Sequence, residues 1–456
     1  MTITTATLRE MARSIFIQSL TDCSVEEAFA RLVRVSDSGR RVLIGGSEAI
    51  DLEHLKHLRI VAVGKASATM LGALLNCLKG LPHDVAGILI AGAQPANLPP
   101  GFQFFAGGHP LPNEASQAGA RAALEMLHGL REGRSDAAAT LCLFLISGGG
   151  SAMMELPLDP SITLAEMRSF YQELVHSGAS IAEINCIRKH FSAVKGGRLA
   201  VAAAGVATLS LLVSDVAPDH LDALASGPTL PDTSTVDQCR EIVARYGLQD
   251  QFPAAVRRFF DRLDLPETPK PGSFAGKAIT LLSSDQLAAA ARVRAEGLGF
   301  HAVIDNTCDD WDYQAAAEYL VGRLRSLRSI HPRICLISAG EVTVKLPSTL
   351  SKRGLTGVGG RNQHFSLYAA TLLDPSDAST VILSAGSDGI DGNSQAAGAV
   401  VDEGTLETDA QYGDAAAQKY LREFDSHSIL APLGSTIVTG PTGNNLRDLR
   451  ILLAAN

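Results

Sequence analysis

The sequence predicts an α/β fold whose sheets contain parallel strands, and three observations support this prediction. Short apolar runs, such as residues 141–146 and 381–385, have the length and composition of strands that are covered on both faces. Each run ends in a loop of Gly, Ser and Asp residues, and a helical segment follows the loop. The recurring order of strand, polar loop and helix is typical of α/β folds that bind ligands at the carboxyl ends of their strands.

The chain length predicts two domains, because 456 residues exceed the usual size of one domain. Residues 263–277 are rich in Pro, Gly and Lys and mark the expected boundary. We therefore expect a Rossmann-like domain with a parallel sheet over residues 1–265. A smaller α/β domain is expected over residues 275–456.

Composition restricts the classes of partner. The formal net charge is −9, which argues against non-specific binding of nucleic acid but allows a local basic site for an anionic substrate. No apolar run is long enough to span a bilayer, and the N-terminus lacks the pattern of a signal peptide. We expect a cytoplasmic protein without nucleic-acid or membrane partners, and the sequence leaves a homo-oligomer open.

The seven cysteines are dispersed along the chain, and none forms a C-x-x-C pair. They fit buried free thiols in a reducing compartment. The sequence contains no Cys–His cluster with the spacing of a zinc site.

The first strand–helix junction places a lysine beside a helix start. Residues 5–35 are expected to form two helical segments, and residues 58–63 form a strand that ends at Gly64. Lys65 follows at the start of a helix, where free N–H groups favour anions. The run is not a Walker A motif, which requires G-x-x-x-x-G-K-[ST]. Lys65 is therefore either an anion-binding residue or a solvated lysine at a helix start.

The strand at residues 141–146 leads into the clearest signal for an anion-binding loop. This loop consists of Ser147, Gly148, Gly149, Gly150 and Ser151. Three glycines in a row can direct several backbone N–H groups at a phosphate. The loop matches neither the dinucleotide fingerprint G-x-G-x-x-G nor the nucleophile pattern G-x-S-x-G.

Basic residues gather in a later helical stretch. Helices are expected over residues 163–177 and 181–204, the second with two glycines in its middle. Its basic residues are Arg188, Lys189, His190, Lys195 and Arg198. They form either a solvated helix face or a positive wall for an anionic ligand, and we favour the wall, with Lys195 and Arg198 as candidates. His109, on a loop between glycine and proline, is expected to be structural or exposed.

Carboxylates follow two of the expected strands. The strand at residues 209–213 leads to Asp215, and the strand at 381–385 leads to a loop that contains Asp388 and Asp391. Carboxylate oxygens are ligands that Mg²⁺ prefers, so all three aspartates are metal candidates. Asp215 and Asp388 are also candidates for a catalytic base. The alternative is that these aspartates are solvated residues of polar turns.

The second domain contains further expected elements and two more polar loops. Strands are expected at residues 278–284, 301–306, 333–338 and 397–402, and helices at residues 286–296 and 309–327. The loop at residues 355–363 has glycines beside Arg361, Asn362 and Gln363, which are hydrogen-bond donors. The last expected strand ends in a loop with Gly440, Thr442 and Gly443.

A series of ordered motifs makes the chain resemble the type 2 glycerate kinases, a family with a MOFRL C-terminal domain. The motifs are VAVGKAS (61–67), GGHPLPNE (107–114), SGGGSAMMELP (147–157), RKHFSAVKGGRLA (188–200), SDVAPDHLDALASGPTLPD (214–232), GEVTV (340–344), GVGGRNQ (357–363), GSDGIDG (386–392) and TGPTGNNLRDL (439–449). The resemblance extends from about residue 6 to residue 453.

This resemblance implies ATP-dependent phosphorylation of D-glycerate to 2-phosphoglycerate with Mg²⁺, in a cleft between two α/β domains. Lys65, Arg361 and Asp388 match functional positions of the family, with Asp215 as a companion. The glycine loops at 147–151 and 440–443 would then hold the nucleotide phosphates, and Asn362 and Gln363 would contact ligand.

The chain departs from the family pattern at His364, where an acidic residue is usual, and at Asn444, where threonine is usual. Both departures concern specificity more than the reaction. Some members of the family carry the name hydroxypyruvate reductase, so a reductase that uses NAD(P)H stays as an alternative. A sensor of sugar acids or nucleotides without turnover is a third hypothesis, which the strand-end aspartates disfavour.

Overall fold

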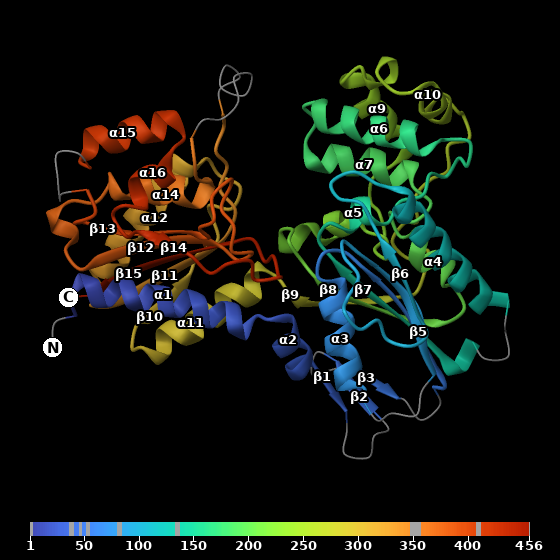
Figure 1. Ribbon diagram of the computed structural model, residues 1–456, viewed down its shortest axis with the longest axis horizontal. Helices are drawn as coiled ribbons and strands as arrows, with labels where there is room; N and C mark the ends of the chain where they lie inside the picture. The colour runs from blue at the N-terminus through green and yellow to red at the C-terminus, as the bar shows by residue number, and fades with distance from the viewer. Residues whose placement is uncertain are drawn as a thin grey trace. The chain divides into compact units, whose positions relative to one another are not determined.

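The computed structural model describes residues 3–35, 41–44, 48–51, 55–79, 84–132, 137–346, 357–406 and 412–455. The chain divides into two compact units, which Figure 1 shows as separate groups of elements. The N-terminal unit comprises Ala28–Leu281. The C-terminal unit combines Leu282–Asn456 with Met1–Glu27.

The N-terminal unit is built on a six-stranded sheet in the order β6-β5-β4-β7-β8-β9. Its strands are β4 (His57–Val63), β5 (Asp84–Ala91), β6 (Phe102–Ala106), β7 (Thr140–Ser147), β8 (Ala207–Val213) and β9 (Lys277–Leu282). The pairings among β4 to β8 are all parallel. Apolar runs such as β7, buried along its whole length, therefore form the predicted parallel sheet. Their carboxyl ends meet at one edge.

Helices cover this sheet, and a separate helical layer lies beyond one end of it (Figure 1). The helices are α3 (Ser67–Cys77), α4 (Glu114–Glu132), α5 (Gly150–Met153), α6 (Leu164–His176), α7 (Ile181–Phe191), α8 (Arg198–Ala202), α9 (Val236–Arg245) and α10 (Ala254–Phe260), with the 3-10 turns η1 (Ala137–Ala139), η2 (Pro218–Ser226) and η3 (Leu248–Asp250). Helices α6, α7, α9 and α10 share an aromatic core around Phe170 and Phe191. A small antiparallel sheet is formed by β1 (Val33–Val35), β2 (Arg41–Ile44) and β3 (Glu48–Asp51).

The helix expected over residues 181–204 is interrupted. Helix α7 ends at Phe191, and α8 begins only at Arg198. Gly196 and Gly197 between them have φ values of 55° and 85°, a left-handed conformation that favours glycine. The two glycines turn the chain rather than kink one helix.

The C-terminal unit contains a mixed six-stranded sheet in the order β10-β11-β15-β12-β13-β14. Its strands are β10 (His301–Ile304), β11 (Arg333–Gly340), β12 (Thr380–Gly386), β13 (Gly398–Asp402), β14 (Thr436–Ile437) and β15 (Asp448–Ala455). Only β10 and β11 pair in parallel; β15 lies antiparallel between β11 and β12. The second sheet is thus mixed, whereas the first is largely parallel.

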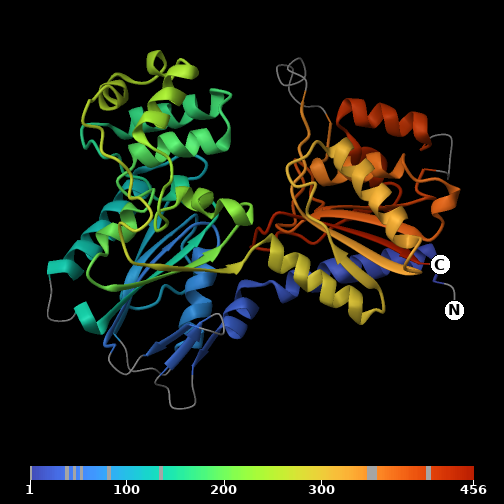
Figure 2. The ribbon, with the colours of Figure 1, turned by 180° about the vertical axis from the view of Figure 1, so that it is seen from behind.

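Helices lie on both faces of the mixed sheet, as Figures 1 and 2 show. One face is covered by α1 (Thr5–Asp22) and α11 (Ser284–Gly297). The other carries α12 (Tyr313–Arg328), α14 (Arg361–Ala370), α15 (Asp414–Glu423) and α16 (Ser426–Leu430), with the short turn η4 (Pro375–Asp377) nearby. Helix α2 (Val25–Leu32) follows α1.

Helix α1 packs on the C-terminal unit, although the sequence analysis placed its residues in the first domain. Its apolar face buries Leu8 and Phe16. Arg9 forms an ion pair with Asp402 and donates a hydrogen bond to the Val400 carbonyl. Asp22 forms an ion pair with Arg294. The compact units therefore differ from the predicted domains at residues 1–27. They also divide at 281–282, just after the Pro- and Gly-rich stretch that was expected to be the boundary.

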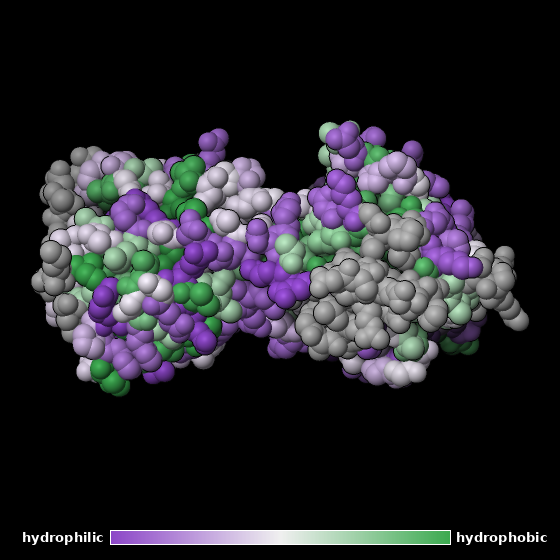
Figure 3. All heavy atoms as spheres, turned by 90° about the horizontal axis from the view of Figure 1, so that it is seen from below, coloured by the Kyte–Doolittle hydropathy of each residue, from purple (hydrophilic) through white to green (hydrophobic). Residues whose placement is uncertain are grey.

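On the side of the C-terminal unit that carries α1 and α11, hydrophilic and hydrophobic residues are interspersed (Figure 3). The large exposed apolar side chains here are Ile17 on α1, Val293 on α11 and Leu298, which directly follows α11. Within the described ranges, no helix combines the length and the apolar character needed to cross a membrane.

Candidate functional site

The carboxyl edge of the parallel sheet brings Lys65, the 147–151 loop and Asp215 together. The Lys65 N–H donates to the Gly148 carbonyl at 2.8 Å. A Cβ atom on Gly148 would lie 1.9 Å from Oδ2 of Asp215, and one on Gly149 would lie 3.0 Å from Cγ of Lys65. The loop can therefore approach both side chains this closely only with glycine at these positions. The Lys65 side chain is exposed at this edge.

His109 belongs to the same group of residues, which the sequence did not predict. Its Cδ2 lies 3.3 Å from the position that a Cβ on Gly149 would take, on the same side as Lys65. Partial burial and the charge of Lys65 lower the pKa of His109 below its usual value. A neutral imidazole beside a lysine at a glycine loop can donate or accept a hydrogen bond. The GGHPLPNE motif, which contains His109, was the sequence feature that could have indicated this position.

The two serines of the loop hold it in place. The buried Oγ of Ser147 accepts a hydrogen bond from the Ala66 N–H at 3.0 Å. The Ser151 hydroxyl contacts the Ser226 hydroxyl at 2.6 Å, and Ser226 donates in turn to Asn185. These hydroxyls are used within the protein, so the backbone of Gly148 to Gly150 is the better candidate for ligand contact.

Lys195 and Arg198 lie inside the framework of the N-terminal unit, unlike the wall expected from the sequence. Lys195 is buried and pairs with the fully buried Glu155 at 2.5 Å, and Glu155 also accepts from the Tyr171 hydroxyl. Arg198 donates to the carbonyls of Lys189, Pro266 and Glu267. Lys195 neutralises a buried carboxylate and Arg198 binds three backbone carbonyls, so we assign both cations structural roles.

The C-terminal unit contains a pocket of about 860 Å³ beside the amino end of α14. Its lining combines charged groups with glycine backbone and a few apolar side chains. The lining residues used below are Glu341, Gly360, Arg361, Asn362, His364, Asp388, Asp391 and Phe424. Polar groups that converge on a concave surface with apolar walls are typical of a small-molecule site.

Arg361, the first residue of α14, is held between two carboxylates. Its Nε donates to Asp448 at 2.6 Å, its Nη2 donates to the same carboxylate at 3.1 Å, and Nη2 lies 2.7 Å from Glu341. These hydrogen bonds and charges hold the pKa of Arg361 above its usual value despite burial. Burial and the charge of Asp448 raise the pKa of Glu341. The guanidinium is therefore permanently charged and rigidly oriented, with 37% of its side chain still exposed.

Asp391 caps helix α14. Its Oδ1 accepts from the Asn362 N–H at 3.0 Å, and its Oδ2 accepts from the Gln363 N–H at 2.9 Å. The amide side chains of Asn362 and Gln363 donate to the same carboxylate. Ser384 and His427 satisfy the two amide oxygens. This network uses the groups that the sequence assigned to metal and ligand binding, and it instead stabilises the start of the helix.

Asp388 lines the pocket and belongs to a loop that the 440–443 segment supports. Thr442 donates from its N–H to the Asp388 carbonyl at 3.1 Å and from its hydroxyl to the Ser387 carbonyl at 2.6 Å. A Cβ on Gly389 would lie 2.0 Å from the Gly440 carbonyl oxygen. Thus Thr442 and Gly440 hold the Asp388 loop, and the Asp388 carboxylate accepts one hydrogen bond, from the Ile390 N–H.

The two departures from the family pattern have different surroundings. His364 is buried; its Nδ1 lies 2.9 Å from the Ser426 hydroxyl, and its ring stacks on Phe424. Burial lowers the pKa of His364 to about 4, so its imidazole is neutral near pH 7. Asn444 donates to the carbonyl of Cys23 and so contacts the end of α1.

Two known families match separate parts of the chain. Residues 11–261 match a domain of unknown function called DUF4147, and residues 334–448 match the MOFRL family.

Comparisons with individual proteins cover most of the chain. It is 34% identical to a D-glycerate 2-kinase of Thermotoga maritima, over 89% of this chain and 92% of that protein. It is 31% identical to a glycerate 2-kinase of Pyrococcus horikoshii, over 98% of both. It is also 34% identical to a putative hydroxypyruvate reductase of Agrobacterium vitis, over 86% of both. The solved structure of a glycerate kinase from T. maritima superimposes with a TM-score of 0.81 at 30% identity, covering 99% of this chain and 100% of that one.

Proposed function

The chain belongs to the glycerate kinase family, and from this membership we propose that it transfers the terminal phosphoryl group of ATP to D-glycerate, forming 2-phosphoglycerate. One structural observation supports the proposal most directly. An exposed lysine lies beside a glycine loop at the carboxyl edge of a parallel sheet, next to an aspartate. Phosphoryl transfer depends on positioning and on cations that stabilise phosphoryl charge, and this group supplies both.

We propose separate roles for the charged residues. Lys65 stabilises the charge of the transferring phosphoryl group, and the backbone of the 147–151 loop binds phosphate oxygens. Arg361, oriented by Asp448 and Glu341, binds the glycerate carboxylate through the N–H groups of its Nη1 atom. Asp215 or Asp388 accepts the proton of the attacking hydroxyl.

Mg²⁺ fits the oxygen donors of these loops. Each unit offers a carboxylate of its own: Asp388 lines the pocket of the C-terminal unit, and Asp215 lies beside the glycine loop of the N-terminal unit. Oxygen is the ligand that this hard cation prefers. When bound, Mg²⁺ would offset the charge of the nucleotide phosphates. Asp391 is not included, because its two oxygens cap α14.

A coupled assay tests the proposed function. The protein is incubated with D-glycerate, ATP and Mg²⁺, and separately with hydroxypyruvate and NADH or NADPH. We expect ADP and 2-phosphoglycerate in the first reaction and no nicotinamide oxidation in the second. Nicotinamide oxidation without ADP would instead establish the reductase, the activity named for the A. vitis relative.

The same assay separates an enzyme from a sensor. Binding of glycerate or ATP without ADP release would contradict the kinase proposal and support the sensor hypothesis. As a second readout, Lys65→Ala and Arg361→Ala should each reduce turnover strongly, and near-normal turnover in both variants would contradict the proposed roles.

A further inference from the structure

A pair of cysteines in the helical layer of the N-terminal unit has an unusual environment. Cys186 on α7 and Cys239 on α9 lie with His190 so that their sulfur and nitrogen atoms are all within 4.8 Å of one another. The three residues are buried between packed helices. This cluster could not be predicted from the sequence, because Cys239 is far from the other two residues along the chain.

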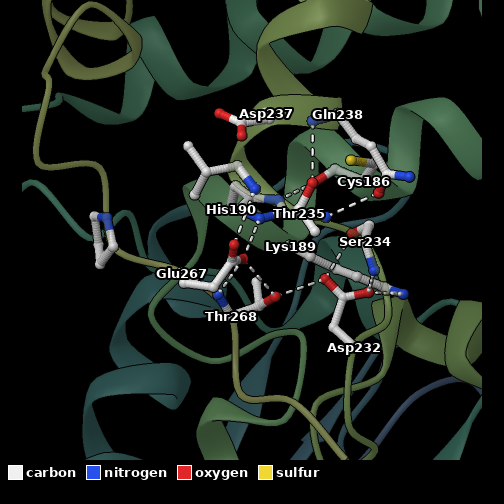
Figure 4. A network of polar contacts seen from close by, with 12 residues as sticks. Cys186, Lys189, His190, Asp232, Ser234, Thr235, Asp237, Gln238, Glu267 and Thr268 are labelled. Atoms are coloured by element: carbon white, nitrogen blue, oxygen red, sulfur yellow. Dashed lines mark hydrogen bonds and ion pairs between the residues drawn. The ribbon is translucent and has the colours of Figure 1, made fainter.

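Both ring nitrogens of His190 face an oxygen acceptor, and Figure 4 shows the contact with Glu267. Its Nδ1 lies 2.8 Å from the Cys186 carbonyl oxygen, and its Nε2 lies 3.0 Å from Oε1 of Glu267. Both partners are acceptors, so the arrangement requires an imidazolium. The pKa of His190 is accordingly raised despite burial, and hydrogen bonds lower the pKa of Glu267 to about 2.

Glu267 is itself fixed by several donors. The N–H groups of Val236 and Thr268 donate to it at 3.1 Å and 2.9 Å, and the Lys270 ammonium lies 2.9 Å from it. The carboxylate therefore holds the His190 ring in one orientation, much as a carboxylate orients the histidine of a nucleophilic enzyme.

This environment favours a thiolate at Cys186. A hydrogen bond from Cys239 and the positive charge of the nearby His190 lower the pKa of Cys186 to about 5. The same contact raises the pKa of Cys239, so Cys239 keeps its proton. Thiolate is the reactive form of cysteine. Cys186 is also the more accessible of the two, with 5% of its surface exposed against 0% for Cys239.

We propose that Cys186 and Cys239 form a peroxide-sensitive redox pair, in which Cys186 is oxidised first and Cys239 resolves it to a disulfide. The Cys186 thiolate attacks one oxygen of hydrogen peroxide, and the O–O bond breaks. The departing hydroxide takes the His190 proton and leaves as water. Cys239 then attacks the sulfenic sulfur: the S–S bond forms, the S–O bond breaks, and the Cys239 proton leaves with the hydroxide as a second water. Both sulfurs are oxidised, and the peroxide is reduced.

The geometry favours this pair over a metal site. Soft metals bind Cys₂His sets, but a histidine ligand needs a free lone pair, and here both ring nitrogens face acceptors. Three donors come together in the described part of this unit, whereas a closed structural zinc site has four. Formation of the disulfide requires the two sulfurs, now within 4.8 Å of each other, to approach to about 2.05 Å.

The test uses the full-length protein, reduced and then exposed to hydrogen peroxide. Remaining thiols are alkylated, and peptides are mapped by mass spectrometry. We expect a peptide that links Cys186 to Cys239 with the loss of two hydrogens, and its reversal by dithiothreitol. Cys239→Ser should abolish the link and leave a sulfenic acid at Cys186 that dimedone traps. Cys77→Ser is the matched control, since Cys77 is half-buried with a raised pKa, and it should leave the link unchanged.

A further variant measures the role of the imidazolium. His190→Gln should slow oxidation of Cys186 at least tenfold at pH 7, because the thiolate loses its cationic partner. Preferential oxidation of Cys77, with both Cys186 and Cys239 still reduced, would overturn the proposal. Stoichiometric zinc in the purified protein, lost in Cys239→Ser, would overturn it as well and establish a metal site.

Discussion

The two candidate regions each present one cation beside a glycine-containing loop, but they hold it differently. Lys65 in the N-terminal unit has an exposed side chain, and its backbone N–H binds the Gly148 carbonyl of the loop. Arg361 in the C-terminal unit forms ion pairs with both Asp448 and Glu341. In the N-terminal unit, the side chain proposed to act in catalysis therefore contributes little to the stability of the fold. In the second, the residue that would bind substrate also neutralises a nearly buried carboxylate, so the two properties are coupled.

Arg361→Ala should have the largest effect and would change both properties. Turnover with glycerate should fall about 1,000-fold, equivalent to about 4 kcal/mol, because the oriented cation is lost. Stability should fall by about 2 kcal/mol, because Asp448, with 2% of its side chain exposed, loses its partner. Kinetics and urea unfolding measure the two losses. Arg361→Lys is the control, which keeps the charge without the bidentate geometry and should recover stability more than turnover.

Lys65→Ala should reduce kcat about 100-fold and change the free energy of unfolding by less than about 0.5 kcal/mol, because the side chain is exposed. Steady-state kinetics and thermal unfolding of the same preparation check this. A loss of stability as large as that of Arg361→Ala would remove the contrast between the two regions.

His364→Gln should change how the stability of the C-terminal unit depends on pH. The folded protein resists protonation of His364, whose pKa is about 4, whereas the unfolded chain takes up this proton near pH 6.5. The wild type therefore loses stability as pH falls from about 6.5 to about 4, and the variant should lose about 1 to 3 kcal/mol less. Urea unfolding at pH 7 and pH 4.5 measures the difference. Parallel pH curves for both proteins would contradict a buried neutral histidine.

Asp391→Asn should have the smallest effect, a loss of about 1 to 2 kcal/mol, because the amide replaces one acceptor oxygen at the start of α14 and removes its charge. The Mg²⁺ concentration that gives half-maximal activity should stay unchanged. A large increase in that concentration would show that Asp391 takes part in binding Mg²⁺.

The sequence was sufficient for the features that depend on strand ends. Lys65, Gly148 and Asp215 follow parallel strands, whose carboxyl ends must meet, so their proximity follows from topology alone. The roles of Lys195 and Asp391 could not be predicted from the sequence, because they depend on where each side chain points. Lys195 turns inward to Glu155, and Asp391 turns to the amino end of a helix that comes before it in the chain. The Cys186–Cys239 contact depends on the packing of two helices, and no local pattern encodes it.

The position of α1 has a consequence during synthesis of the chain. This helix leaves the ribosome before the elements on which it packs, from α11 to β15, which begin roughly 260 residues later. At typical rates of translation the delay is about 10 to 50 s. During that time the apolar face with Leu8 and Phe16 has no native partner in the C-terminal unit. The N-terminal unit, which is continuous from Ala28 to Leu281, can fold in the meantime, and the C-terminal unit can be completed only when both α1 and β15 have been synthesised.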